Sequence, residues 1–205
     1  WQRGGVSNST RGMWAGGSYP GSATYDKIEA VTIASEGTAF EFGDLTISVV
    51  DHFGFASPTR GVWGGGITAP ATYRDVIDYV QIATKGNAAD FGNLVAAYRS
   101  AHGCSNATKG IWGGGQTPTV QDALQFVTIA TLGNTVDFGN LTDARAGGGA
   151  CASPTRGIWA GGYDPSKSNI IDYVQIPASG NAQDFGDLTT PTQYCGTFSN
   201  GHGGL

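Results

Sequence analysis

Short runs of apolar residues alternate along the whole chain with clusters of glycine, proline, asparagine and serine. The runs are rich in β-branched and aromatic residues, and no apolar pattern with a 3.6-residue period extends beyond a single turn. Runs of this kind predict β-strands, and the clusters between them predict tight turns. We therefore expect an all-β fold.

The apolar runs recur in a unit of about 48 residues that is marked by three anchor segments in a fixed order. The first anchor carries a tryptophan followed by paired glycines, and its copies are RGMWAGG at 11–17, RGVWGGG at 60–66, KGIWGGG at 109–115 and RGIWAGG at 156–162. The second anchor is an apolar segment, and its copies are KIEAVTIA at 27–34, VIDYVQIA at 76–83, ALQFVTIA at 123–130 and IIDYVQIP at 170–177. The third anchor is EFGDL at 41–45, DFGNL at 90–94 and 137–141, and DFGDL at 184–188.

The anchors divide residues 1–205, which we treat as one domain, into four complete units at about 5–52, 53–101, 102–148 and 149–195. In the fourth unit we expect strands near 148–152, 157–162, 171–176 and 183–188. The short turns between them predict a four-stranded antiparallel meander. Because one such sheet cannot bury both of its faces, we expect the four sheets to pack around an axis as the blades of a β-propeller.

Aromatic residues repeat at two positions of the unit and form the expected core. Glycine pairs such as Gly65–Gly66 end the second strand without Cβ atoms, which allows neighbouring backbones to approach closely. The tryptophan two positions earlier then fills a fixed place between sheets. The expected core residues are Trp14, Trp63, Trp112, Trp159, Phe42, Phe91, Phe138 and Phe185.

The C-terminal segment 193–205, QYCGTFSNGHGGL, aligns with the start of a further unit and predicts an extra first strand. Phe198 falls where Cys104 stands in the third unit, yet Val6 already occupies that place in the first unit. The segment either completes a four-bladed ring beside the N-terminal strands or is received by a neighbouring blade or subunit. We favour the four-bladed ring and leave its closure open.

Charge and composition exclude several classes of partner. Sixteen acidic and 11 basic residues give a net charge of -5, and no run of lysine or arginine provides a basic surface for nucleic acid. No stretch approaches the roughly 18 apolar residues of a membrane-spanning helix, and the first residues lack the pattern of a signal peptide. We expect neither a nucleic-acid partner nor membrane insertion.

Histidines and cysteines are the candidate metal ligands and nucleophiles. His52 and His102 lie in equivalent first strands, but no matching third histidine completes a zinc set, because His202 is out of phase. Cys104 and Cys151 share a position that Val6, Phe55 and Phe198 fill in the other copies, which is typical of a packing position; with Cys195 they are odd in number and lack CxxC spacing. We expect no metal, no cofactor and no catalysis.

Acidic and basic residues also recur with the unit. The acidic positions are Glu41, Asp90, Asp137 and Asp184, and three residues later Asp44, Asn93, Asn140 and Asp187. General acid–base catalysis needs two carboxyls in different environments, whereas these are copies in the same one. The basic residues Arg11, Arg60, Lys109 and Arg156 precede the second strand, and we expect them to form structural ion pairs with those acids.

The loop after each glycine pair differs between copies, and variable loops on a rigid repeated scaffold commonly carry recognition. Its tyrosines could stack on sugar rings, with charged neighbours as polar contacts. The candidate binding residues are Tyr19, Tyr25, Tyr73, Arg74, Tyr163, Asp164 and Lys167. The alternative is that these tyrosines cover the edges of the blades.

The unit resembles the kelch repeat, which combines a basic residue, a strand ending in Gly-Gly, a strand carrying tyrosine and an aromatic on the last strand. In the second unit these parts are Arg60, Gly65–Gly66, Tyr79 and Phe91. Kelch repeats usually carry tryptophan on the last strand, whereas this chain has phenylalanine there and tryptophan before Gly-Gly. The resemblance implies a propeller with kelch-like blades.

The combination of IDYVQIATxGNAxDFGxL with TRGxWxGG resembles repeats in structural and tail-associated proteins of marine and cyanobacterial phages, over nearly the whole chain. This resemblance implies a virion or extracellular location and a non-enzymatic propeller, tail- or fibre-associated, for host-surface binding or assembly. Its partners would be other virion proteins, copies of itself, or a host-surface glycan or protein. The alternatives are a purely structural self-assembling virion subunit, a secreted lectin-like propeller that binds carbohydrate, and, least favoured, a kelch-type oxidase with copper.

Overall fold

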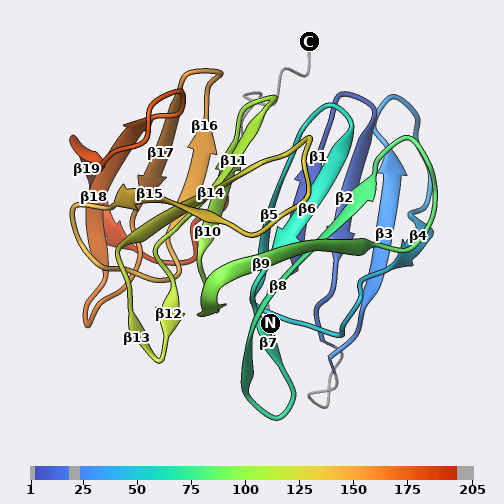
Figure 1. The fold of residues 1–205 in the computed structure, drawn as a ribbon, viewed down its shortest axis with the longest axis horizontal. Helices are drawn as coiled ribbons and strands as arrows, with labels where there is room; N and C mark the ends of the chain where they lie inside the picture. The colour runs from blue at the N-terminus through green and yellow to red at the C-terminus, as the bar shows by residue number, and fades with distance from the viewer. Residues whose placement is uncertain (1–2, 19–23, 198–205) are drawn as a thin grey trace.

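Four antiparallel sheets, one for each sequence unit, make up the protein in a computed structural model that describes residues 3–18 and 24–197. We call the sheets blades 1 to 4. No helix occurs among the described residues, so none is available to span a membrane in that part of the chain. Figure 1 shows the blades side by side, with blade 1 in blue at one side of the view and blade 4 in orange and red at the other. The fold is all-β and propeller-like.

Each blade contains four main strands in the order of the chain. Blade 1 contains β1 (Gly4–Ser7), β2 (Arg11–Ala15), β3 (Lys27–Thr32) and β4 (Phe40–Asp44). Blade 2 contains β5 (Phe53–Ala56), β6 (Arg60–Gly64), β8 (Thr72–Gln81) and β9 (Ala89–Tyr98), and a short β7 (Ile67–Thr68) pairs with the start of β8. Blade 3 contains β10 (His102–Ser105), β11 (Lys109–Gly113), β14 (Ala123–Thr128) and β15 (Val136–Asn140), with a hairpin of β12 (Gln116–Thr117) and β13 (Thr119–Val120). Blade 4 contains β16 (Gly149–Ala152), β17 (Arg156–Ala160), β18 (Ser168–Gln175) and β19 (Gln183–Thr192).

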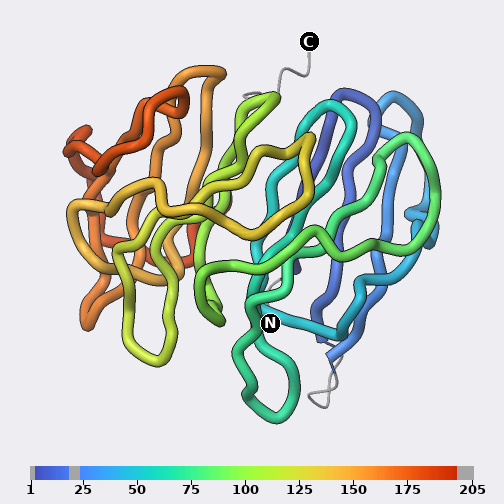
Figure 2. Tube along the Cα trace, viewed as in Figure 1, coloured from blue at the N-terminus to red at the C-terminus, as the bar shows by residue number. Residues whose placement is uncertain are grey.

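The first strands of the blades, β1, β5, β10 and β16, lie next to one another in the middle of the molecule, as the tube in Figure 2 traces. The fourth strands lie toward the outside. Three core clusters fill the spaces between blades, and each cluster combines residues of two neighbouring blades. In the middle cluster, for example, Phe55 and Phe91 of blade 2 pack with Trp112 and Val127 of blade 3. The core is therefore divided among three interfaces between blades.

A β-bulge interrupts the pairing of the third and fourth strands at the same place in every blade. In blade 2, Ile77 pairs with Gly92 and Asp78 pairs with Asp90, so Phe91 is the extra residue. A bulged residue leaves the regular alternation of the strand and its side chain is redirected. Phe91 points toward the next blade, which covers it, and it is 2% exposed. The same shift occurs between residues 28 and 29, 124 and 125, and 171 and 172.

The described part of the C-terminal segment continues the repeat but does not close a ring. The amide of Tyr194 donates to the carbonyl of Gly147 at 2.5 Å, as Gly147 does to Ser100 and Ser100 does to Asp51. All four residues have positive φ, between 54° and 66°, so Tyr194 is the fourth described copy of one position. Among the described residues no hydrogen bond joins the segment 194–197 to β1. The ring favoured from the sequence is therefore not seen there, and Phe198, like residues 199–205, lies outside the described residues.

Candidate functional site

Tryptophan joins each blade to the one before it. The indole Nε1 of Trp63 donates to the carbonyl of Gly4 at 3.1 Å, and Trp112 and Trp159 make the equivalent bonds to Phe53 and His102 at 3.2 and 3.1 Å. These three tryptophans are no more than 2% exposed. The sequence expectation of a tryptophan between sheets thus holds for blades 2 to 4, whereas Trp14 of blade 1 is 42% exposed.

The repeated basic residues join each blade to the one after it, and the ion pairs expected for them are wrong. Arg60 donates to the carbonyl of Ile129 at 2.7 Å, and Lys109 donates to the carbonyl of Ile176 at 3.2 Å. Arg11 makes the equivalent bond to Ile82. The carbonyl lies closer than any repeated acid because the neighbouring blade packs over the turn. Each cation also lies over an aromatic ring of its own blade, as Arg60 does over Tyr79 at 4.8 Å and Arg156 over Tyr173 at 4.9 Å.

The turn before each fourth strand docks on the fourth strand of the preceding blade. The amide of Gly133 donates to the carbonyl of Phe91 at 2.8 Å, and the side-chain oxygen of Asn134 accepts from the amide of Asn93 at 3.0 Å. Equivalent bonds link residues 86–87 to blade 1 and residues 180–181 to blade 3. The contact is close, since a Cβ atom built on Gly92 would lie 2.4 Å from the carbonyl oxygen of Gly133. The repeated glycine of the third anchor is required for this approach.

Gly139→Ala is expected to destabilise the protein by about 2 kcal/mol more than Gly186→Ala. Both glycines have φ near +140° (146° and 135°), so the two variants share backbone strain of about 1–3 kcal/mol. Only at Gly139 would the new Cβ meet a backbone oxygen, that of Gly180 at 2.3 Å; at Gly186 nothing lies within 4 Å. Urea unfolding at low protein concentration, followed by tryptophan fluorescence, measures the difference. Equal losses would contradict the role of close blade packing.

The repeated acids have structural partners. The carboxylates of Asp90 and Asp184 each accept the amide of the glycine two residues later at 3.0 Å, within the bulge. In blade 1 the exposed Lys27 contacts Glu41 and Asp44 at 2.9 Å each. Exposed pairs of this kind contribute little to stability. No group of three or more metal-ligating side chains occurs within residues 3–18 and 24–197.

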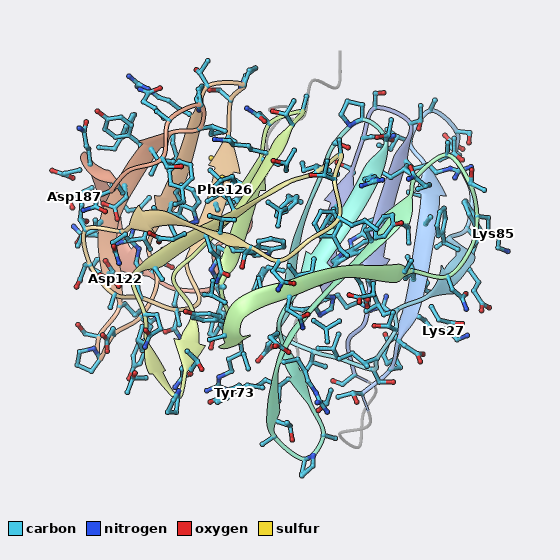
Figure 3. All side chains as sticks on the ribbon, viewed as in Figure 1. Lys27, Tyr73, Lys85, Asp122, Phe126 and Asp187 are labelled. Atoms are coloured by element: carbon cyan, nitrogen blue, oxygen red, sulfur yellow. The ribbon has the colours of Figure 1, made fainter. Side chains whose placement is uncertain are left out.

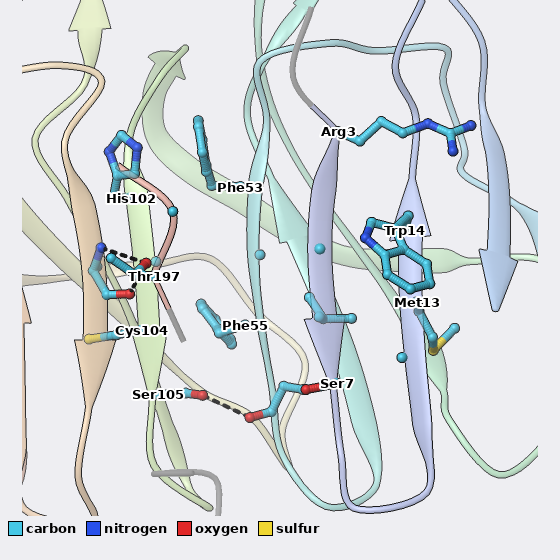
Figure 4. Close-up of a pocket in the computed structure, with 18 of the residues that line it drawn as sticks. Arg3, Ser7, Met13, Trp14, Phe53, Phe55, His102, Cys104, Ser105 and Thr197 are labelled. Atoms are coloured by element: carbon cyan, nitrogen blue, oxygen red, sulfur yellow. Dashed lines mark hydrogen bonds between the residues drawn. The ribbon is translucent and has the colours of Figure 1, made fainter. Parts of the chain in front are cut away.

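A cavity of about 500 Å³ lies in the middle of the molecule, bordered by all four first strands and by residues 194–197. Figure 4 shows Phe53 and Phe55 on one side, His102 and Cys104 on another, and Trp14 beyond β1. The hydroxyl of Thr197 bonds to both the carbonyl and the amide of Ala150, at 2.6 and 3.2 Å. The walls of the cavity are mainly glycine backbone and apolar side chains.

Two buried histidines near the middle of the molecule are held neutral. Burial lowers the pKa of His52 to about 4, and neither ring nitrogen has a hydrogen-bond partner in the described structure. Burial, together with the nearby positive charge of Arg145, lowers the pKa of His102 to about 3. Burial also raises the pKa of the Cys104 thiol, which leaves it protonated and unreactive at neutral pH. These groups are poor candidates for nucleophiles or general bases, and His202 lies outside the described residues.

The variable loops of blades 2, 3 and 4 leave the blades at one end of the molecule, which we call the loop rim. In Figure 1 it is the lower edge, where the β7–β8 and β12–β13 hairpins project, and Figure 3 labels Tyr73 there. Tyr73 is half-buried beneath Arg99, whose guanidinium lies 5.6 Å from the ring. Tyr25 is half-buried and contacts Arg3, with the guanidinium 4.9 Å from its ring. Both tyrosines are therefore only partly accessible at the loop rim.

The remaining loop candidates are more accessible but belong to separate blades. Tyr163 is 47% exposed in blade 4, and its neighbours Asp164 and Lys167 are exposed. Arg74 of blade 2 donates its Nε to the hydroxyl of Thr68 at 3.1 Å within the β7–β8 hairpin. Tyr19 lies outside the described residues. The structure thus groups Tyr163, Asp164 and Lys167 on one loop and leaves the blade 2 candidates on another.

No protein-family model and no curated protein matches the chain. Among solved structures, the one titled "Structure of YjhT" superposes with a TM-score of 0.78 over 94% of this chain and 72% of that chain. The two sequences are 14% identical over the match. At this identity the likeness establishes the fold alone.

Sequence reasoning missed the partners of the repeated polar residues, because those partners are backbone atoms of the next blade. It also missed Arg145, which pairs with Asp172 at 2.6 Å; their side chains are 3% and 0% exposed. Arg145 lies where the first two units have Val49 and Tyr98, so no periodic signal marks it. A buried arginine without repeat counterparts could have been found only by comparing the units position by position.

Proposed function

We propose that this chain is a non-enzymatic propeller of a phage virion, tail- or fibre-associated, that mediates host-surface binding or assembly. The observation that carries the proposal is a difference between the polar residues that repeat in every unit and those that do not. The polar residues that repeat are engaged between blades or within bulges, whereas non-repeated exposed ones such as Tyr163, Asp164 and Lys167 project from the loop rim. The kelch-like unit and its resemblance to phage repeats support the virion setting.

The loop rim offers recognition chemistry of a simple kind. An exposed tyrosine ring can stack on the apolar face of a sugar, and the carboxylate of Asp164 and the ammonium of Lys167 can bond to its hydroxyls. The loop is anchored at its base, because Tyr163 and Ala146 exchange backbone bonds at 2.9 and 3.2 Å. A ring held on a rigid scaffold loses little conformational freedom on binding.

Tyr163→Ala is expected to reduce binding to host cells or to a glycan array about tenfold or more, the loss typical of a contact residue worth over 1 kcal/mol. Leu132→Ala is the matched control, because Leu132 is 55% exposed in a turn between the third and fourth strands of blade 3, away from the loop rim. Binding that survives Tyr163→Ala would contradict the loop site. Stoichiometric copper in the purified protein would contradict a non-enzymatic role.

A further inference from the structure

The two ends of the row of blades each present one half of an interface that the molecule forms three times. We call the outer side of blade 1 the N-face, with Trp14, Glu29 and Ile33. We call the outer side of blade 4 the C-face, with Arg156, Phe185, Gly186, Thr189 and Gly149, of which Gly149 is buried under Cys195 and Thr197. Figure 3 labels Lys27 and Asp187 at these opposite ends.

The N-face exposes residues that are buried in every other blade. Trp14 is 42% exposed, whereas its three copies are at most 2% exposed. Ile33 is 55% exposed, whereas its three copies are at most 1% exposed. The copies are Trp63, Trp112 and Trp159, and Ile82, Ile129 and Ile176. The difference arises because each copy is covered by the blade before it, whereas no described blade covers Trp14 and Ile33.

The C-face shows the reciprocal difference. Phe185 is 52% exposed, although its copies in the other blades are at most 2% exposed. Gly186 has no atom within 4 Å of a built Cβ, while its copies have a backbone oxygen of the next blade at 2.2–2.4 Å. Arg156 occupies the position from which Arg60 and Lys109 bond to a carbonyl of the following blade. The C-face therefore carries the donors and the space that a following blade uses.

We propose that the N-face of one copy docks on the C-face of a second copy, head to tail, in the register of the internal interfaces. Continuity with those three interfaces identifies the partner, since the missing groups of each face are present on the other. Trp14 would donate to the carbonyl of Gly149, as Trp63 does to Gly4. Arg156 would donate to the carbonyl of Ile33. This inference deepens the assembly part of the proposed function and rests on it.

A polar contact on the third strand follows the same register. Asp78 accepts the amide and hydroxyl of Thr46 at 3.0 and 2.7 Å across the first interface, and Asp172 accepts those of Thr142 across the third. The corresponding residues at the free ends are Glu29 on the N-face and Thr189 on the C-face. Glu29 is paired with Arg3 at 2.6 Å. On docking, Glu29 would either exchange Arg3 for Thr189 of the second copy or contact both residues.

Residues 194–197 compete for part of the C-face. Tyr194 and Thr197 bond to Gly147 and Ala150, where the first strand of an incoming blade 1 would lie. The incoming strand therefore has to displace this segment, which weakens the association. Thr197→Ala removes the bonds to Ala150 and is expected to tighten association several-fold.

The test uses two variants of the full chain, Trp14→Arg to block the N-face and Phe185→Arg to block the C-face. Both side chains are exposed, so both variants should fold, and circular dichroism verifies this. Sedimentation velocity should show concentration-dependent association of the unmodified chain over about 1–200 µM, a range suited to an interface of modest quality. Each variant alone should be monomeric, and an equimolar mixture should form a one-to-one heterodimer, because one open face of each kind remains. Val136→Ala, which removes a 58% exposed side chain from blade 3, should associate like the unmodified chain.

An unmodified chain that stays monomeric overturns the proposal. A Trp14→Arg or Phe185→Arg variant that still associates alone also overturns it, because this would indicate pairing of like faces. Host-cell binding is measured on the same proteins. If the chain does not self-associate but host-cell binding still depends on Tyr163, the proposed function is retained and only this inference is contradicted. If neither self-association nor host-cell binding is observed, both the inference and the proposed function are contradicted.

Discussion

Trp112→Ala is expected to lower the free energy of unfolding by about 3–5 kcal/mol, the usual cost of truncating a buried tryptophan, whereas Trp14→Ala should change it by less than about 1 kcal/mol. Trp112 is 1% exposed, its ring lies 4.4 Å from that of Phe55, and its indole bonds to the carbonyl of Phe53. Trp14 occupies the same position of its own blade, but no described blade covers it and it is 42% exposed. Urea unfolding followed by circular dichroism measures both losses.

This pair of variants is its own control, because the residue type, the strand position and the glycine pair two residues later are the same. Unfolding is measured at a protein concentration at which the chain is monomeric, so that docking of the N-face does not add to the measured stability. A loss at Trp14 as large as that at Trp112 would contradict the open arrangement of the blades, because it would mean that blade 1 is covered.

The strands could be predicted from the sequence because their signals are local. In blade 4, strands expected near 148–152, 157–162, 171–176 and 183–188 occur at 149–152, 156–160, 168–175 and 183–192. The repeat also predicted that tryptophan lies between sheets, since a large side chain beside paired glycines has few other places to pack. Four blades in the order of the chain follow from the same periodicity.

Closure of the ring could not be predicted in this way, because it depends on the angle between neighbouring sheets. A small difference in that angle, set by side chains such as Phe55 and Trp112 at each interface, accumulates over the blades. The repeat treats all copies alike, whereas Trp14 and Phe185 are exposed because no described blade covers them. The partners of Arg60 and Lys109 were missed for a related reason, since backbone carbonyls leave no mark in a sequence.

Arg145→Leu is expected to destabilise the protein by about 3–5 kcal/mol at neutral pH, because it leaves the buried carboxylate of Asp172 without its cation. Arg145 and Asp172 are 4% and 0% exposed, and Nη2 of the arginine lies 2.6 Å from Oδ2 of the aspartate. In the variant Asp172 keeps its two hydrogen bonds from Thr142. The loss of stability therefore reports the missing arginine and not the loss of those two hydrogen bonds. Urea unfolding near pH 7.5 measures the loss.

The loss caused by Arg145→Leu should become smaller as the pH falls toward 5, because a proton can neutralise the unpaired carboxylate in the folded state. Asp78 holds the same position in blade 2 without an arginine, and burial raises its pKa. A carboxyl with a raised folded-state pKa costs stability above that pKa, and the cost disappears as the pH falls toward the value in the unfolded chain. The double variant Arg145→Leu with Asp172→Asn should recover part of the stability at neutral pH, since blade 3 holds the neutral Gln125 at this position. A loss that is the same at both pH values, with no recovery in the double variant, would show that packing by the arginine side chain, and not its charge, stabilises the interface between blades 3 and 4.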